Sequence, residues 1–401
     1  MAVGEASTDF KVVPGVRLAS VPCGIKGQDE LDLVLFEFEP GSVTAGIFTQ
    51  SHFAGAPVQV GRRHLEQKDS RFFLINSGNA NAATGEEGRT DAEACCHAVS
   101  QRTGALPEEV IPFSTGVIGE KLQVANITDA LPELYGSLNE TNWLLAAQGI
   151  MTTDTRPKIA SRQIEIDGEL ITMTGIAKGA GMIQPNMATM LVYIATDAKL
   201  SRDCLQEVLL SGADQSFNRI TVDSDTSTND SCMLTATGVS GVVCDAGAAA
   251  TSFKDSLHAL MQELAQGIIR DAEGATKFVT VTVTGGKCEA DCLSVAYAIA
   301  NSPLMKTALF ASDANWGRIV MAIGKADADI DPEKIDVYLG DVQLMAAGGK
   351  EASYVEEAGA AVMQGEEITI KVDLNLGEAI ETVWTSDLSH DYVSINADYR
   401  T

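Results

Sequence analysis

The sequence predicts a mixed fold of the α/β or α+β class, neither all-helical nor all-β. Apolar residues recur at the 3.6-residue period of helices in some segments and at the two-residue period of strands in others, and the two kinds of segment alternate along the whole chain. With 401 residues, 45% of them hydrophobic, the chain can also bury a large core. No Pro-rich or Ser-rich linker separates independent domains, so we expect one co-folded body.

Three helices are predicted. A capping box that starts at Thr90 opens a helix running to about Thr103. Ser201 can cap a second helix, because its hydroxyl precedes an apolar face at helical spacing. A third, long helix is marked by apolar residues at the same spacing from Phe253 to Ile268. The apolar face of the second helix consists of Leu205, Val208, Leu209 and Ala213.

Strand signals are two-residue alternation or short apolar runs bounded by turn residues. They lie at Leu31–Phe38, Phe72–Asn76, Gln163–Asp167, Ile171–Thr174, Thr189–Ala195, Met233–Val239 and Phe278–Val283. Further strands are predicted at Ile335–Leu339, Glu367–Leu374 and Ile380–Thr385, separated by acidic and glycine-containing turns. So many strands require at least two sheets, and we expect the last group to form a smaller lobe over roughly 285–401.

The net charge of −27 arises from 55 acidic and 28 basic residues. Such a charge repels phosphate backbones and anionic lipid surfaces, so we predict no nucleic-acid partner and no membrane association. It also repels an anionic substrate, which would therefore need a lysine or arginine placed in its site. The first 15 residues contain no basic stretch followed by an apolar one, and we expect a cytoplasmic protein.

The cysteines and histidines do not have the spacing of a metal site. The eight cysteines are scattered, and reduced thiols are the expectation for a cytosolic chain. Cys288 and Cys292, with Glu289 and Asp291 between them, could be metal ligands, but no histidine nearby completes a four-ligand set. The five histidines show no H-E-x-x-H spacing. We predict no metal and no bound cofactor.

The segment from Gly179 to Thr196 is the most informative stretch of the sequence. It places the Ala188–Thr189 bond immediately before a strand-like run. If this bond breaks, Thr189 gains a free α-amine beside its own hydroxyl and becomes a nucleophile that carries its own base. A threonine before a strand is far more often an ordinary strand residue. The glycines and Pro185 ahead of it favour the turned, strained backbone that an N→O acyl shift requires.

Two further patterns allow a functional and an ordinary interpretation. Lys178 is the last charge before Thr189, and composition favours a solvated surface lysine over a cation that holds a substrate carboxylate. The segment 114–119 is a predicted glycine-bearing turn with a hydroxyl residue at its tip. Such a turn can point an N–H group and a threonine hydroxyl at a developing oxyanion, or it can be a plain loop.

Seven separated blocks of the sequence together carry a resemblance to a known family. They are NSGNAN (76–81), STGVIG (114–119), KGAGMI (178–183), MATML (187–191), DAEGATK (271–277), DANWGR (313–318) and NADYRT (396–401). In identity and order they resemble the bifunctional glutamate N-acetyltransferase/ornithine acetyltransferase family of arginine biosynthesis. The departures that we note, Ala83 and Ala314, lie outside the reactive residues.

The resemblance implies a role for particular residues. Thr189 corresponds to the nucleophile, released by autoproteolysis between Ala188 and Thr189 into an α chain of residues 1–188 and a β chain of residues 189–401. Thr115 and Gly116 correspond to the oxyanion hole. The positions implied in substrate binding are Thr152, Lys178, Thr189, Glu273, Asn396 and Thr401.

The resemblance also implies a fold and a reaction. The fold is an αββα sandwich like that of N-terminal-nucleophile hydrolases, with the smaller C-terminal α/β lobe. The reaction is acetyl transfer from N2-acetylornithine to glutamate, with acetyl-CoA as a further donor in bifunctional members. The assembly is an α2β2 heterotetramer. An amidohydrolase or aminopeptidase with the same nucleophile, and a non-catalytic binding protein, are the alternatives.

Overall fold

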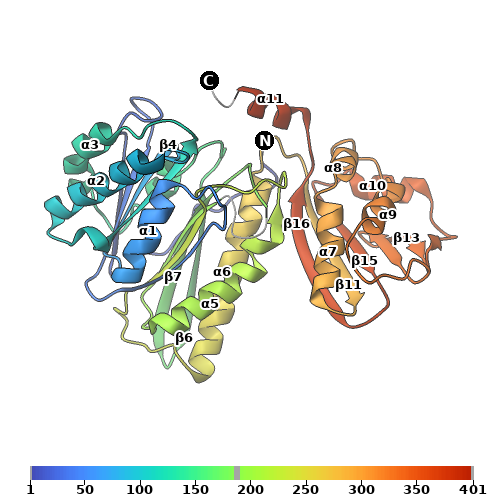
Figure 1. Cartoon of the computed structure of the whole chain (residues 1–401). Coiled ribbons are helices and arrows are strands. Elements are labelled where there is room, and N and C mark those ends of the chain that lie inside the picture. The colour runs from blue at the N-terminus through green and yellow to red at the C-terminus, as the bar shows by residue number, and fades with distance from the viewer. Residues whose placement is uncertain (1, 185–189, 399–401) are drawn as a thin grey trace. The chain divides into compact units, whose positions relative to one another are not determined.

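In a computed structural model that describes residues 2–184 and 190–398, the chain forms two units (Figure 1). The sandwich unit consists of Ala6–Asn218 and Asp225–Ile268. The seven-stranded unit consists of Met1–Glu5, Arg219–Ser224 and Ile269–Thr401, and the lobe expected over roughly 285–401 lies within it.

The sandwich unit contains two sheets. The four-stranded sheet has the order β1 (Val16–Val21), β2 (Leu33–Phe38), β4 (Phe72–Asn79) and β5 (Val110–Val117). The five-stranded sheet has the order β3 (Val43–Phe48), β10 (Ser231–Ala236), β8 (Leu191–Thr196), β7 (Glu169–Lys178) and β6 (Lys158–Ile166). Strand β5 runs parallel to β4, and β8 is parallel to β10 and antiparallel to β7.

Aromatic side chains from both sheets form the core between them. Tyr193 of β8 lies 5.0 Å from Phe113 of β5 and 5.5 Å from Phe36 of β2, measured between ring centroids. All three rings are buried, and each such ring contributes about 1.5–3 kcal/mol through removal from water. Because Tyr193 is four residues beyond Thr189, this packing anchors the strand that follows the candidate nucleophile.

Helices cover the outer faces of both sheets. Helices α2 (Gly85–Thr103) and α3 (Val124–Gly136) pack on the four-stranded sheet, in a cluster that includes Cys96 and Leu131. Helices α5 (Arg202–Gln215) and α6 (Gly247–Arg270) cover the five-stranded sheet, where Leu260 and Leu264 approach Gly175 of β7. The order of layers is therefore αββα, as the resemblance implied.

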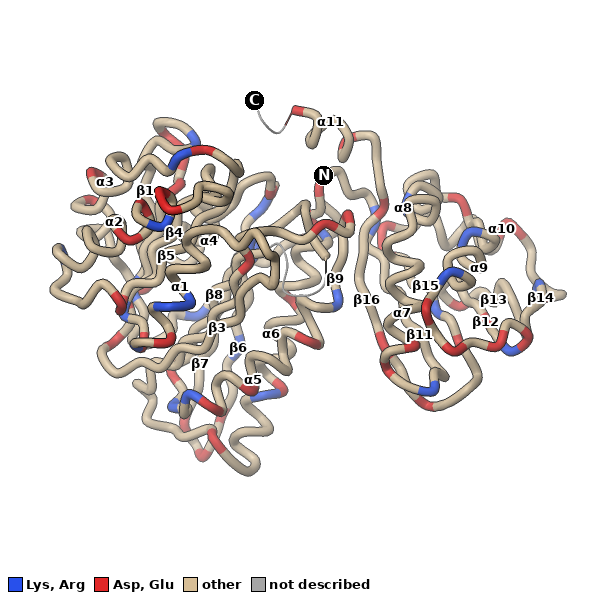
Figure 2. The backbone as a smooth tube through the Cα atoms, in the orientation of Figure 1, with Lys and Arg blue, Asp and Glu red and all other residues tan. Residues whose placement is uncertain are grey.

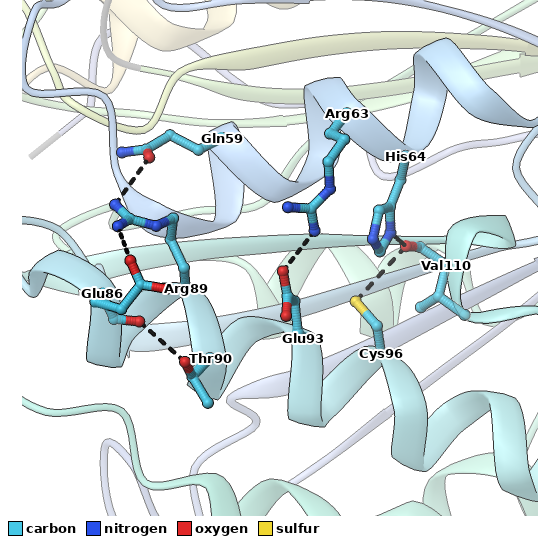
Figure 3. Close-up of polar contacts among 9 residues, drawn as sticks. All are labelled: Gln59, Arg63, His64, Glu86, Arg89, Thr90, Glu93, Cys96 and Val110. Carbon is cyan, nitrogen blue, oxygen red and sulfur yellow. Dashed lines mark hydrogen bonds and ion pairs between the residues drawn. The ribbon is translucent and has the colours of Figure 1, made fainter.

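Polar contacts hold helix α1 (Ala56–Gln67) against α2 and against the start of β5 (Figure 3). Arg63 donates to Glu93 across the two helices at 2.6 Å. His64 Nδ1 lies 2.8 Å from the Val110 carbonyl oxygen, which also accepts from the Cys96 thiol at 3.6 Å. These contacts fix the beginning of β5, the strand that carries Thr115 and Gly116 near its other end.

The seven-stranded unit is a mixed sheet covered by helices. Its order is β14 (Gly349–Lys350), β13 (Val342–Ala346), β12 (Asp336–Leu339), β15 (Glu367–Asp373), β11 (Phe278–Gly286), β16 (Ala379–Ser386) and β9 (Ile220–Thr221). Its helices are α7 (Glu289–Ala300), α8 (Pro303–Phe310), α9 (Trp316–Gly324), α10 (Glu356–Met363) and α11 (His390–Asp398). Valines of β11 and α7, among them Val281 and Val295, lie in one buried cluster.

Most predicted elements are confirmed, and two predictions are wrong. Ser201 caps α5, with its side chain accepting from the Cys204 N–H at 3.5 Å. Helix α2 begins at Gly85 rather than at Thr90, whose hydroxyl instead donates to the Glu86 carbonyl at 3.1 Å inside the helix. Acidic residues in the first turn stabilise this earlier start through the helix dipole. The predicted turn at 114–119 begins as strand, because β5 continues to Val117.

Acidic residues are spread over both units of the fold (Figure 2). They lie on helices and loops of each unit, so the net charge of −27 does not arise from one acidic segment. Among the described helices, none combines the length and the hydropathy that crossing a bilayer would need.

Candidate active site

Three strands of the five-stranded sheet meet at the beginning of β8. Its first residue, Leu191, pairs with Lys178 at the end of β7 and with Ser231 at the start of β10. Ala188 and Thr189 lie outside the described residues. Thr189 is two residues before Leu191 in the sequence, so this end of the sheet is where the candidate nucleophile is attached.

The predicted oxyanion-hole residues lie at the end of β5 in the other sheet. Thr115 pairs with Ser77 and Gly116 with Gly78 in the parallel β4–β5 ladder, which is irregular just beyond this point. Gly116 has φ of +132°, and a Cβ there would lie 2.2 Å from the Gly78 carbonyl carbon. Only glycine allows the two backbones to approach so closely.

A buried asparagine connects the ends of the two sheets. The side-chain amide of Asn229, which is next to Asp230 at the start of β10, donates to the Ser114 carbonyl at 2.9 Å and to the Ala80 carbonyl at 2.5 Å. Because Ser114 precedes Thr115, these bonds place Thr115 and Gly116, the predicted oxyanion-hole pair, beside the end of the sheet at which β8 begins. The structure therefore brings together Thr115, Gly116 and Lys178.

The NSGNAN block supports this arrangement from β4. The Ser114 hydroxyl donates to Asn76 Oδ1 at 2.6 Å, and the Asn76 amide donates to the Asn79 carbonyl at 2.8 Å. Both side chains are buried, so breaking either bond would leave a polar group without its partner. The block thus has a structural role next to Thr115 and Gly116.

Lys178 is buried, with 8% of its surface exposed, so the interpretation as a solvated surface lysine is wrong. Asp154 lies nearby: its Oδ1 accepts from the Gly179 N–H at 2.8 Å and from Lys158, and its Oδ2 accepts from the Thr152 N–H at 3.0 Å. Asp154 therefore joins the substrate-binding candidates Thr152 and Lys178.

The charges of these buried groups are coupled. Burial alone would raise the pKa of Asp154, but Lys158, Lys178 and the Gly179 N–H together lower it to about 2. Burial lowers the pKa of Lys26, while Asp32, Glu30 and more weakly Asp154 oppose this and Lys178 adds to it. Lys158 and Lys178 thus act on one ionised carboxylate near the end of β7.

Glu273 and Asn396 belong to the seven-stranded unit, where they contact each other. The Asn396 amide, on α11, donates to Glu273 Oε2 at 2.7 Å. The DAEGATK block is fixed by Asp387, which accepts from the Thr276 N–H at 2.8 Å and from the Lys277 N–H at 2.9 Å. Thr401 lies outside the described residues.

Sequence reasoning missed four residues of the site: Lys26, Asp154, Asn229 and Asp230. Three of them had a detectable signal. Asp154 stands four residues before Lys158, which is the spacing of an ion pair, and Asn229 and Asp230 end a polar run directly before an apolar strand. Within 2–184 and 190–398, no three histidine, cysteine or acidic residues are grouped to hold a metal ion.

Comparisons with known proteins agree with the sequence blocks. The sequence model of the ArgJ family matches residues 17–401. The chain is 52% identical over 393 residues to the arginine biosynthesis bifunctional protein ArgJ of Pseudomonas fluorescens (strain Pf0-1), covering 97% of each chain. It is 49% identical over 407 residues to the protein of that name from Psychrobacter arcticus, covering 100% of each.

A solved structure is similar as well. The crystal structure of arginine biosynthesis bifunctional protein ArgJ from Bacillus halodurans is 36% identical, with a TM-score of 0.50, over 51% of this chain and 97% of that chain. The family match and the two relatives extend over nearly the whole sequence. This chain therefore belongs to the ArgJ family.

Proposed function

We propose that this protein transfers an acetyl group from N2-acetylornithine to glutamate, in arginine biosynthesis, through an acetyl ester of Thr189. The observation that carries the proposal is the convergence at the start of β8. Lys178, Asp230 and, through Asn229, the Thr115–Gly116 pair all lie at the end of the sheet to which Thr189 is attached. A nucleophile, an oxyanion site and a buried cation are the parts that acyl transfer requires.

The first half-reaction forms the ester. After cleavage between Ala188 and Thr189, the free α-amine, with a reference pKa of about 7.7–8.0, accepts the hydroxyl proton as Oγ attacks the acetyl carbonyl carbon. Thr115 and the Gly116 N–H hold the oxyanion. The C–N bond then breaks, the amine returns its proton to the leaving nitrogen, and ornithine departs.

The second half-reaction reverses these steps with a different amine. The α-amino nitrogen of glutamate attacks the ester carbonyl, the Thr189 amine takes the proton, and the C–O bond breaks. Thr189 regains its hydroxyl proton and N-acetylglutamate leaves. Donor and acceptor use one site in turn, so the kinetics are ping-pong.

Both substrates carry an α-carboxylate, which a protein of charge −27 would otherwise repel. Lys178 supplies the cation for it. The family resemblance adds Thr152, Glu273, Asn396 and Thr401 as substrate contacts, and the Glu273 carboxylate can pair with a substrate ammonium group.

A cut chain is supported by the length of the solved relative. The Bacillus halodurans chain is matched over 97% of its length by 51% of this sequence, so it is a chain of about half the length. We propose that this protein is likewise two chains, 1–188 and 189–401, from one precursor. We further propose a cytoplasmic α2β2 assembly.

The Thr189→Ala variant tests the mechanism. It removes the hydroxyl needed both for self-cleavage and for the ester, so we expect an intact chain without measurable transfer activity. Denaturing mass spectrometry measures the cut, and N-acetylglutamate formation measures transfer. The Thr196→Ala variant, at the far end of β8, is the matched control and should remain cut and active. Normal turnover by the uncut Thr189→Ala protein would refute the proposal.

Product analysis separates transfer from hydrolysis. An acetyltransferase yields N-acetylglutamate only when glutamate is present, whereas an amidohydrolase with the same nucleophile yields free acetate.

The relatives are named bifunctional, and we propose acetyl-CoA as the second donor. Formation of N-acetylglutamate from acetyl-CoA and glutamate, in the absence of N-acetylornithine, tests this second activity.

A further inference from the structure

Asp230 is a buried acid that the proposed mechanism does not use. It directly precedes β10 and is 2% exposed. The following residue, Ser231, pairs with Leu191 and donates its N–H to the Met190 carbonyl at 3.0 Å. The register therefore sets the Asp230 carboxyl beside Met190, at the beginning of β8.

The Asp230 carboxyl is only partly satisfied. It accepts hydrogen bonds from the Met190 N–H and from the Ser227 hydroxyl. Its Oδ2 atom is buried and has no hydrogen-bond partner among residues 2–184 and 190–398. A buried carboxyl oxygen without a partner is costly in a fold, and such atoms recur at functional sites.

We propose that Asp230 is a positioning residue for Thr189: it holds the Met190 N–H, which belongs to the peptide bond joining Thr189 to Met190, and presents its second oxygen at that same end of β8. The inference rests on the proposed role of Thr189 as nucleophile. A peptide unit is planar and includes both flanking Cα atoms, so a hydrogen bond that fixes its N–H also restrains the Cα that carries the Thr189 side chain. The orientation of the Thr189 hydroxyl toward a substrate would depend on this restraint.

The proposed role also requires an uncharged Asp230. Burial raises the pKa of Asp230 well above its ordinary value, although Lys178 from β7, the Met190 N–H from β8 and the Ser227 hydroxyl all oppose this. A neutral carboxyl leaves the nearby α-amine free to lose its proton. A carboxylate there would raise the pKa of the amine and keep it an ammonium, which cannot accept the hydroxyl proton.

Two substitutions separate position from charge. Asp230→Asn keeps an uncharged oxygen that accepts the Met190 N–H, so we expect a cut protein with kcat within about threefold of the parent. Asp230→Ala removes the acceptor, so kcat should fall by about 10–100-fold, the equivalent of a lost buried hydrogen bond, with KM for both substrates nearly unchanged. The acid limb of the pH–rate profile should not move in the Asn variant. Infrared difference spectra should show a protonated-carboxyl band that this variant lacks.

Asp197 provides the matched control. It lies just beyond the other end of β8, is 4% exposed, and accepts the Thr172 N–H at 2.8 Å, so it also holds a backbone group of the same sheet. Asp197→Ala should lower the melting temperature but leave kcat unchanged. Equal losses of kcat in Asp230→Ala and Asp197→Ala would mean a merely structural role for Asp230.

Two outcomes would overturn the inference. An Asp230→Asn protein that folds but is as inactive as Asp230→Ala would show that a charge or a transferable proton is needed. An Asp230→Ala protein of normal kcat would show that no positioning occurs. Neither outcome affects the proposed function, which instead fails if the parent protein transfers acetyl groups as a single uncut chain.

Discussion

Gly116 lies where the backbones of β4 and β5 come closest. An added Cβ would lie 2.2 Å from the Gly78 carbonyl carbon and 2.5 Å from the Asn79 nitrogen, and these backbone atoms cannot rotate away as a side chain could. Its φ of +132° is in addition a conformation that other residues rarely adopt. Both the close contact and the conformation bear directly on the proposed oxyanion hole.

We therefore predict that Gly116→Ala lowers kcat by about 10²-fold or more, the effect of losing one oxyanion donor. Gly119→Ala is the control, because Gly119 has φ of +85° but nothing within 4 Å of an added Cβ. It carries the conformational strain of about 1–2 kcal/mol without the clash, and should keep near-normal kcat. Steady-state kinetics and thermal melts of both variants measure the difference. Equal losses of kcat in the two would contradict the predicted role of the contact.

At the level of single residues, the sequence indicated candidates only where they stand in a local pattern. The STGVIG and KGAGMI blocks pointed to Thr115, Gly116 and Lys178. Asp154 and Asp230 were not predicted, because their roles depend on strands that pair only in the folded chain. The burial of Lys178 was missed for the same reason, since an acidic partner 24 residues earlier is not a sequence signal.

Secondary-structure elements meet at Asp154, which lies in the loop before β6. It binds the N–H groups of Thr152 and Gly179 and forms a buried ion pair with Lys158, so one carboxylate joins this loop to the ends of two strands. Removing one partner of such a pair leaves an uncompensated buried charge, which costs about 3–5 kcal/mol. The end of β7 that carries Lys178 depends on this carboxylate.

We predict that Asp154→Asn lowers the free energy of unfolding by about 3–5 kcal/mol at neutral pH. The lowering of its pKa from an unfolded value of about 3.9 to about 2 is worth about 2–3 kcal/mol. Because the folded pKa is the lower one, this stability is complete above pH 4 and is lost as the pH falls to 2. The stability gap between parent and variant should therefore narrow between pH 4 and pH 2 in urea titrations.

The control for this prediction is Glu93→Gln, which removes the exposed ion pair with Arg63 in the same unit (Figure 3). Exposed pairs contribute little, so the pH dependence of this variant should follow that of the parent. If the difference in unfolding free energy between the parent and Asp154→Asn stayed constant down to pH 2, Asp154 would not be ionised in the folded protein.

At the level of elements, periodicity predicted long and strongly patterned segments best. The helix from Phe253 to Ile268 lies inside α6, and the strand signal at Phe278–Val283 lies inside β11. The start of α2 was wrong because its first turn is polar and glycine-containing, which resembles a loop. Helix α1 was missed because it contains polar and charged residues, and its apolar side chains are buried only once α2 and β5 are in place.

The sheet order in the sandwich unit could not be predicted, because it joins distant parts of the chain. Strand β3 pairs with β10, which begins nearly 190 residues later in the chain. No shared turn connects the two strands, so no local sequence pattern indicates that they pair. The αββα arrangement came from the family resemblance and is confirmed by the layers. A smaller C-terminal lobe was expected from the sequence, but the grouping of Met1–Glu5 and Arg219–Ser224 with it had no sequence signal.

The proposed cut before Thr189 would divide the five-stranded sheet between the two fragments. In the five-stranded sheet, order β3-β10-β8-β7-β6, strands β8 and β10 would belong to the second fragment and the other three to the first. The fragments would thus share two ladders, β3–β10 and β7–β8, and the aromatic core in which Tyr193 packs on Phe113. The Val3 N–H also donates to the Arg270 carbonyl at 2.7 Å, across the same division.

We therefore predict that the two fragments remain together as one particle after cleavage, because separating them would break both ladders and expose the core at once. Size-exclusion chromatography in native buffer should give one peak that resolves into two bands on a denaturing gel. Thr189→Ala should elute at the same volume but give one band. Fragments that separate in native buffer would mean that the sheet does not hold across the cut, and the peptide bond itself would then be needed to keep the fold intact.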